Sequence, residues 1–139
     1  MSEDPVAVIE RYFAAVTDAD ATAEDVAAFI HPDARFIERP NLVAPSGRRR
    51  DAETAVAALG HSRRLMREHR FDVQEHLACG DRVVTRALWT GVLAIDAGDV
   101  PAGTELRADC CMVFTVRDGR VLEQQNYDCY HPLDVPATA

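Results

Sequence analysis

The sequence predicts an α+β protein in which helices come first and long strands follow. Apolar residues recur at helical spacing through much of residues 4–69, whereas from residue 71 onward they alternate with polar residues. Turn-forming segments, CGDR at 79–82 and RDGR at 117–120, separate alternating runs. Helices followed by a meander of strands are expected to cover one face of a curved, mostly antiparallel sheet.

Two helices are expected before residue 34. DPVAVIERYFAAVTDAD (4–20) begins with Asp4 as a plausible N-cap and Pro5 at the first helical position. TAEDVAAFIHPDARF opens with the capping pattern of Thr22 and Asp25, and this short helix should stop near residues 31–32, His-Pro.

A brief strand, ARFIERP, is expected to end at Pro40, and NLVAPSGRRR (41–50) is expected to be a loop. DAETAVAALGHSRRLMREH (51–69) predicts a third helix.

Four strands are predicted after the helices. RFDVQEHLA (70–78) alternates Phe71, Val73 and Leu77 against polar residues, and VVTRALWTGVLAI (83–95) is a long strand. TELRADCCMVFTV (104–116) has one apolar face, made of Leu106, Ala108, Cys110, Met112 and Phe114. The last strand continues VLEQQNYDCY from residue 121 and is unusually polar for a strand of a core sheet.

Length and composition favour one soluble domain spanning residues 1–139, with 132–139 as a loose tail. The chain is 47% hydrophobic and 27% charged, and no apolar run approaches the roughly 20 residues of a membrane helix. Acidic residues stand at the N-terminus where a signal peptide needs basic ones. We therefore expect a cytoplasmic protein with no membrane partner.

The net charge of −8 argues against nucleic acid as a partner, because phosphate backbones would be repelled. GRRRD at 47–51 is the one dense basic segment. Without interleaved aromatics, it is interpreted as a solvated loop or as an anchor for local carboxylates.

Neither the cysteines nor the histidines have a spacing that predicts a metal site. The four cysteines contain no C-x-x-C pair, and the five histidines contain no H-x-H or H-x-x-x-H pair. The cysteines are interpreted as small buried residues in strands. We expect no metal and no cofactor.

The order of these segments resembles a known superfamily. YFAAVTDAD, FIHPDARFIERP, GDRVVTRALWTGVL, PAGTELR and VFTVRDGRVLEQQNYD follow one another as in the nuclear transport factor 2-like superfamily, and more narrowly as in its SnoaL-like branch, which is related to ketosteroid isomerases and polyketide cyclases. The resemblance extends to about His131. It implies a cone, a strongly bent sheet capped by helices around a pocket, and commonly a homodimer formed through the outer face of the sheet.

The resemblance also implies candidate catalytic residues. Isomerases of the superfamily carry a proton-shuttling carboxylate on the first strand near a proline, a position that Glu38 occupies in FIERP. A carboxylate facing an apolar cavity is desolvated, which raises its pKa toward the range useful for proton transfer. The alternative is an exposed edge-strand glutamate paired with Arg39 or with the basic segment.

Other residues could bind the oxygen or the body of a substrate. Tyr12 could take the place of the tyrosine that stabilises an enolate in the isomerases, although its helical spacing also fits a core aromatic. Trp89 could line the cavity or simply fill the core, and Met112 lies on the same apolar side.

The superfamily's epoxide hydrolases make a second comparison. Their local pattern would put an acid where this chain has Asn126, which can orient water but cannot remove its proton. Their central Arg-x-Asp pair is also replaced, by ALW at 87–89. Epoxide hydrolysis is therefore not expected.

One face of the last strand should combine Leu122, Gln124, Asn126, Asp128 and Tyr130, and the family register directs that face toward the pocket. Asp128 is the one carboxylate in this set, and a few polar groups in an apolar cavity are typical of small-molecule sites.

Two functions are consistent with these residues. The first is a cofactor-independent isomerase or cyclase that acts on a small hydrophobic carbonyl compound, with Glu38 or Asp128 as acid and base. The second is a binding or accessory domain without catalysis, in which the polar strand recognises a ligand or satisfies its own hydrogen bonds. Protein transport, as in the superfamily's namesake, has no supporting feature.

Overall fold

Residues 4–133 are described by the computed structural model, and they form one six-stranded sheet with three helices. The elements in chain order are α1 (Pro5–Thr17), α2 (Ala23–Ala27), β1 (Ile30–Glu38), β2 (Arg48–Asp51), α3 (Ala52–Leu65), β3 (Met66–Cys79), β4 (Arg82–Leu93), β5 (Glu105–Arg117) and β6 (Arg120–Tyr130). The strand order is β2-β1-β6-β5-β4-β3, and within residues 4–133 β1 and β6 are the one parallel pair of neighbours. The α+β class is confirmed.

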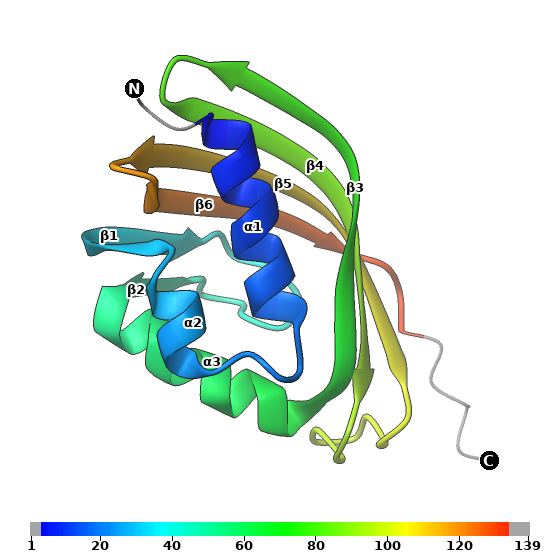
Figure 1. Ribbon diagram of the computed structural model, residues 1–139. Helices are drawn as coiled ribbons and strands as arrows, with labels where there is room; N and C mark the ends of the chain where they lie inside the picture. Colours follow the sequence, from blue (N-terminus) through cyan, green and yellow to red (C-terminus); the bar gives the residue numbers. More distant parts are fainter. Residues whose placement is uncertain (1–3, 134–139) are drawn as a thin grey trace.

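The helices lie on the concave side of the sheet, with α1 crossing it diagonally (Figure 1). Both early helices begin where the sequence predicts. The Asp4 carboxylate accepts a hydrogen bond from the Val6 N–H, and Thr22 and Asp25 cap α2 reciprocally. Helix α2 ends earlier than expected, because Ile30 already belongs to β1.

Two further boundaries were predicted wrongly. Residues 48–50, expected to belong to a loop, and Asp51, expected to begin the third helix, form the edge strand β2, which pairs with the end of β1. Its RRRD sequence has no apolar face, so only the pairing with β1 defines it as a strand. Helix α3 ends at Leu65, and the remaining residues to 69 belong to β3, because Met66 already pairs with Leu93 of β4.

The core lies between α1 and the concave face of β5. The five residues predicted for the apolar face of this strand are all buried. Phe114 is fully buried and meets the rings of Tyr12 and Phe13 edge to face, with centroids 6.3 and 5.8 Å apart. Removing a buried phenylalanine of this kind typically costs about 3–5 kcal/mol of stability.

Two β-bulges change which side chains face inward. In β3 the register shifts between Val73 and Glu75, so His76 turns inward to Thr85 while Leu77 points outward and is 59% exposed. The sequence alternation had predicted the reverse for His76 and Leu77.

A second irregularity lies where β5 pairs with β6. Val116 pairs with Val121, whereas Thr115 pairs with Glu123, so Leu122 is the extra residue. Val121 is therefore fully buried in the core, contrary to its predicted place on the opposite face. Beyond the bulge, the side chains at 124, 126, 128 and 130 are opposite buried residues of β5 and lie on the concave side.

Of the loose tail expected over 132–139, only the first two residues are described. The convex face of the sheet carries no helix in the described part of the chain (Figure 1).

Candidate functional site

A row of polar side chains crosses the concave face of three neighbouring strands. Arg48 of β2 is the Cα partner of Glu38 at the end of β1, and Glu38 is in turn the partner of Asn126 in β6. Neighbouring strands lie about 4.8 Å apart, so these three side chains stand side by side. Asp128 follows two residues later on β6, opposite Cys110. The sheet register thus brings both predicted catalytic carboxylates into one cluster.

Glu38 is positioned by the β1–β2 turn. Its Oε2 accepts a hydrogen bond of 2.8 Å from Asn41 Nδ2, and its Oε1 lies 4.0 Å from Arg48 Nε. The same Asn41 amide donates to the Arg39 carbonyl, while its Oδ1 accepts the N–H groups of Val43 and Ala44. One amide side chain therefore fixes both the turn and the carboxylate.

Of the two partners considered for Glu38 from the sequence, Arg39 and the basic segment, only the basic segment lies beside it. Arg39 donates to Gln125 and lies over the Tyr127 ring on the convex face, so it does not pair with Glu38. Arg48, from the basic segment, does approach Glu38. The Glu38 side chain is 20% exposed, which places it at a partly sheltered rim rather than on an open edge.

Asp128 is a carboxyl group with little water around it. Burial raises the pKa of Asp128 above its ordinary value, the negative charge of Glu38 raises it further, and the Cys110 thiol and Asn126 amide lower it in part. Its Oδ1 atom is buried and has no hydrogen-bond partner among the described residues. Such an atom is well placed to share a proton with a bound molecule.

A directional chain of hydrogen bonds reaches the site from helix α1. The Tyr12 hydroxyl donates to Gln124 Oε1 at 2.8 Å, and Gln124 Nε2 donates to Asn126 Oδ1 at 2.8 Å. Asn126 is thereby left with its N–H donors turned away from Gln124, toward Asp128. Burial raises the pKa of Tyr12 far above its ordinary value, so the phenol keeps the proton that sets this direction.

Aromatic side chains border the cluster. Trp89 and Tyr130 flank the small Ala108 in one cross-strand row, and their rings meet nearly perpendicularly with centroids 6.2 Å apart. The Trp89 indole donates to His69 Nδ1 at 3.2 Å, and burial lowers the pKa of His69, which favours the neutral acceptor. Burial and nearby negative charge raise the pKa of Tyr130.

The predicted substrate-binding residues lie at two depths. Gln124, Asn126, Trp89 and Tyr130 are half-buried, whereas Met112 is fully buried beneath Gln124. Tyr12 is also buried, and its hydroxyl is already bonded to Gln124.

Sequence reasoning missed three residues of the cluster, namely Asn41, His69 and Cys110 as a neighbour of Asp128, and it considered the basic segment beside Glu38 without singling out Arg48. Placing Glu38 and the basic segment on the two arms of one hairpin would have singled out Arg48 and indicated Asn41 in the connecting segment. Cys110 was placed correctly on the apolar face, and burial raises the pKa of its thiol, so the thiolate is disfavoured.

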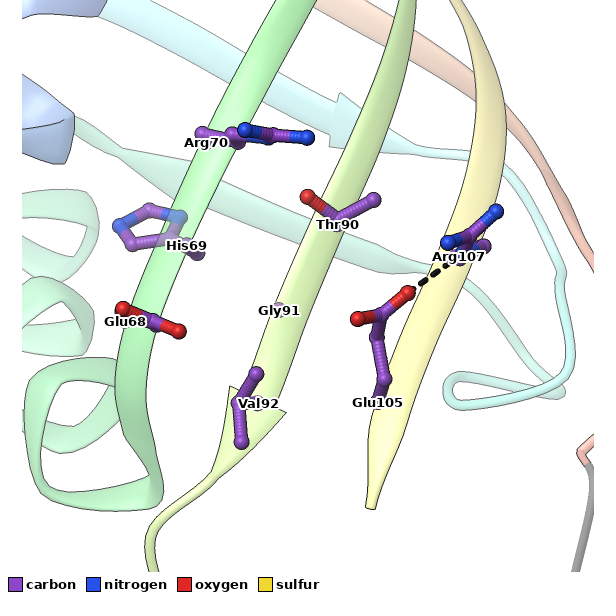
Figure 2. Close-up of a pocket in the computed structure, with 8 residues that line it drawn as sticks. All are labelled: Glu68, His69, Arg70, Thr90, Gly91, Val92, Glu105 and Arg107. Carbon is purple, nitrogen blue, oxygen red and sulfur yellow. Dashed lines mark hydrogen bonds and ion pairs between the residues drawn. The ribbon is translucent and has the colours of Figure 1, made fainter. Parts of the chain in front are cut away.

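A second hollow lies on the convex face, and it shares one lining residue, His69, with this cluster. Figure 2 shows its lining side chains from β3, β4 and β5, in a groove of about 300 Å³. Arg70, Thr90 and Arg107 form one cross-strand row, and Glu68, Val92 and Glu105 form the next. Its charges are balanced, and the Glu105–Arg107 pair is 2.5 Å long and about half exposed.

Among residues 4–133, no three histidine, cysteine or acidic side chains converge as metal ligands would. None of the helices within these residues has the length and apolar character needed to span a bilayer.

Comparison with known proteins identifies the family. The model of the SnoaL-like domain matches residues 9–124. The chain belongs to the SnoaL-like family. No curated protein sequence is significantly similar to it.

Solved structures of SnoaL-like and related proteins share the fold. Wild-type IdmH from Streptomyces antibioticus, a proposed polyketide cyclase, is 25% identical with a TM-score of 0.75, over 91% of this chain and 92% of IdmH. A proposed SnoaL-like polyketide cyclase from Jannaschia sp. CCS1 is 21% identical with a TM-score of 0.71, over 92% and 90% of the two chains. TerC, co-crystallised with polyporic acid, is 19% identical with a TM-score of 0.68, over 88% and 89%. The family match confirms the superfamily predicted from the sequence, and these structures share its fold.

Proposed function

We propose that this SnoaL-like protein is a cofactor-independent enzyme of the isomerase or cyclase type, which moves a proton next to the carbonyl group of a small hydrophobic compound. The observation that carries the proposal is the pair formed by Glu38 and Asp128. Two neighbouring carboxyl groups in unlike environments are the usual arrangement for a base and an acid acting together at one pH.

In this proposal Glu38 is the base. It removes a proton from the carbon beside the substrate carbonyl, and the C–H electron pair moves into the carbon skeleton to give an enolate. Asn41 and Arg48 supply donors around the Glu38 carboxylate, so its approach angle is fixed before the substrate binds.

Asp128 is the acid. Because burial and the Glu38 charge raise its pKa, Asp128 can hold a proton and donate it to the enolate oxygen. The Asn126 amide supports the same oxygen, with Gln124 and Tyr12 orienting it. In an isomerase, Glu38 would return its proton at another carbon while Asp128 takes its own proton back from the oxygen. In a cyclase, the enolate carbon would attack a second carbonyl, the resulting alkoxide would take the proton held by Glu38, and Asp128 would recover its proton as the first carbonyl re-forms.

The hydrophobic part of the substrate would contact Trp89 and Tyr130, with Met112 supporting the floor of the site. The rings offer an apolar, edge-on surface that suits an aromatic or polycyclic compound. TerC, a structural neighbour, was crystallised with polyporic acid, and IdmH is a proposed polyketide cyclase. Both relatives support a small-molecule role for this chain.

A binding function without catalysis is the second candidate. It is favoured by one observation, that Asn126 occupies the position where the related hydrolases have an acid and its amide is already bonded to Gln124. In that case the same cluster would bind a ligand without converting it chemically.

The two candidates separate in an exchange experiment. The α-protons of 2-tetralone in deuterated buffer would be followed by NMR with the wild-type protein, Glu38→Gln and the convex-face control Glu105→Gln. Loss of a general base typically lowers the rate by about 10²–10⁴-fold, so Glu38→Gln should abolish protein-dependent exchange while Glu105→Gln retains it. Saturable binding of 2-tetralone without exchange above buffer would support the binding function.

The proposal extends to assembly and location. A homodimer through the convex face is supported by its mixture of polar side chains with the half-buried Val113 and exposed Tyr127. A monomeric mass in sedimentation at micromolar concentration would contradict it. The cytoplasmic location and the organisation of residues 1–139 as one domain stay predictions from the sequence.

A further inference from the structure

We propose that Arg48 binds an ionised carboxylate of the ligand, so that this protein prefers hydrophobic carbonyl compounds carrying a free acid group close to the reacting carbon. The inference rests on the proposed function, because it adds a specificity subsite to the same cluster.

A groove beside the β1–β2 turn provides room for such a group. It has a volume of about 310 Å³ and is lined by residues 37–40 of β1 and the segment after it, and by residues 46–49 on the other side of the turn. Glu38 and Arg48 both line it, so the groove adjoins the proposed base. Three arginines and one glutamate make its lining positive, although the whole chain has a charge of −8.

Arg48 has unused donors facing this space. A guanidinium group has five N–H donors. In Arg48 one of them, on Nη2, meets the Val43 carbonyl at 3.2 Å, and Nε stands 4.0 Å from Glu38, beyond hydrogen-bond distance. The side chain is 45% exposed. The remaining donors can take the two parallel hydrogen bonds that a carboxylate accepts.

Three other arginines of the sheet, each with a carboxylate within reach, differ from Arg48. Arg35 meets Glu123 at 2.8 Å, Arg86 meets Glu75 at 3.0 Å and Arg107 meets Glu105 at 2.5 Å. Each of them is hydrogen-bonded to a carboxylate of the chain. Arg48 also has a carboxylate beside it, yet Glu38 is directed to Asn41 instead. The guanidinium group of Arg48 thus remains available to a carboxylate from outside.

The position of Arg48 defines where that acid group must be on the ligand. Arg48, Glu38 and Asn126 stand in one cross-strand row, with the base between a cation and an amide. A carboxylate held by Arg48 brings the carbons next to it over Glu38, while a carbonyl further along reaches Asn126 and Asp128. The positive charge of Arg48 also offsets the negative charge that an enolate would add next to the ionised carboxylate of the ligand.

A binding experiment with unreactive probes tests the subsite. Dissociation constants for 2-naphthoate and 2-naphthamide, which have the same ring system, would be measured by calorimetry at pH 7 and low salt. The wild-type protein should bind the acid at least about tenfold more tightly, as expected for a charge-assisted bidentate pair. Arg48→Gln should bind both probes with the affinity of the amide, and Arg48→Lys should keep part of the preference.

Arg35→Gln is the matched control, because it removes an arginine from the convex side of β1. It should retain the wild-type preference for the acid, and a thermal melt would check that each variant is folded. Equal affinity of the wild-type protein for the two probes, or an unchanged preference in folded Arg48→Gln, would overturn the inference.

The two proposals fail separately. If exchange of 2-tetralone depends on Glu38 but the acid is not preferred, the carboxylate subsite alone is wrong. If the acid is preferred through Arg48 but exchange is absent, the catalytic proposal is wrong and the subsite belongs to a binding protein.

Discussion

The two faces of the sheet hold their charged side chains in different environments. On the convex face, Glu105 and Arg107 neutralise each other in contact with water (Figure 2). Such exposed pairs contribute about 0–1 kcal/mol. On the concave face, Asp128 has lost most of its water and is close to another carboxylate, and its pKa rises. The burial of a carboxyl group next to another carboxylate distinguishes the candidate site.

This difference depends on strand parity. A side chain on β5 or β6 moves from one environment to the other when the register shifts by a single residue. Asp109 and Cys110 are consecutive on β5, yet Asp109 pairs with His131 at 2.9 Å on the convex face while Cys110 is buried next to Asp128. A substitution on the convex face can therefore serve as the control for a similar substitution on the concave face.

The largest expected effect separates the two aspartates. Asp128→Asn should lower the α-proton exchange rate by about 10²-fold or more. The raised pKa lets the Asp128 carboxyl group hold a proton and donate it to the substrate, and an asparagine amide cannot act as this acid. Asp109→Asn should leave the rate within about twofold of wild type. Both rates would be measured by NMR in deuterated buffer. Equal losses in the two variants would remove the distinction between the faces.

The sequence predicted much of the fold because its strongest patterns are local. The alternation of β5 and the helix caps at Asp4 and Thr22 need no knowledge of the rest of the chain, and both are confirmed. Strand β2 was missed because RRRD has no apolar periodicity, and its pairing with β1 comes from tertiary contacts alone.

The candidate site was less predictable for the same physical reason. Glu38 and Asp128 were named from a family resemblance, but their proximity depends on the parallel pairing of β1 with β6, which no local pattern encodes. His76 was assigned to the wrong face because a β-bulge inserts one residue without a sequence signal. The basic segment was considered as a partner of Glu38, but Arg48 is singled out within it only once the register of β1 and β2 is known.

The next largest effect concerns the buried support of the concave site. Tyr12→Phe removes the donor to Gln124 Oε1 and leaves a partly buried acceptor unsatisfied, at a cost of about 1–3 kcal/mol in the free energy of unfolding. Because Asn126 also loses its fixed orientation, exchange should fall by roughly tenfold, the factor that 1.4 kcal/mol in a barrier represents.

Tyr127→Phe is the matched control on the convex face, where the side chain is 45% exposed. Urea unfolding and exchange should both stay close to wild type in this variant. If Tyr12→Phe were equally silent, the hydrogen-bond chain from α1 would have no part in the site.

A smaller effect tests the turn that carries Glu38. Gly47 has a φ of +69°, and a Cβ added there would lie 2.6 Å from the Glu38 carbonyl oxygen. Gly103 has a φ of +87° with open space around its Cβ position. Both alanine variants bear the left-handed strain, of about 1–2 kcal/mol, but only Gly47→Ala adds the clash. Gly47→Ala should therefore unfold at lower urea concentration than Gly103→Ala, and equal midpoints would contradict the close approach.

The smallest effect is a pH dependence that belongs to the concave face alone. The pKa of Asp128 in the folded chain lies above its ordinary value of 3.8, so between these two values the folded protein binds more protons than the unfolded chain. The stability that Asp128 contributes is complete below pH 3.8 and is lost as the pH rises through the folded pKa. Relative to Asp128→Asn, which cannot ionise, the wild-type protein should become progressively less stable over that interval.

Urea unfolding at a series of pH values from about 4 to 8 measures this difference between the two proteins, with the ordinary carboxyl pKa as the lower reference. Glu38→Gln supplies a second check, because removing the neighbouring charge should lower the pKa of Asp128 and move the loss of stability to lower pH. A difference that stays constant across the series would mean that Asp128 is as well hydrated as the carboxylates of the convex face, and the contrast between the two faces would then rest on geometry alone.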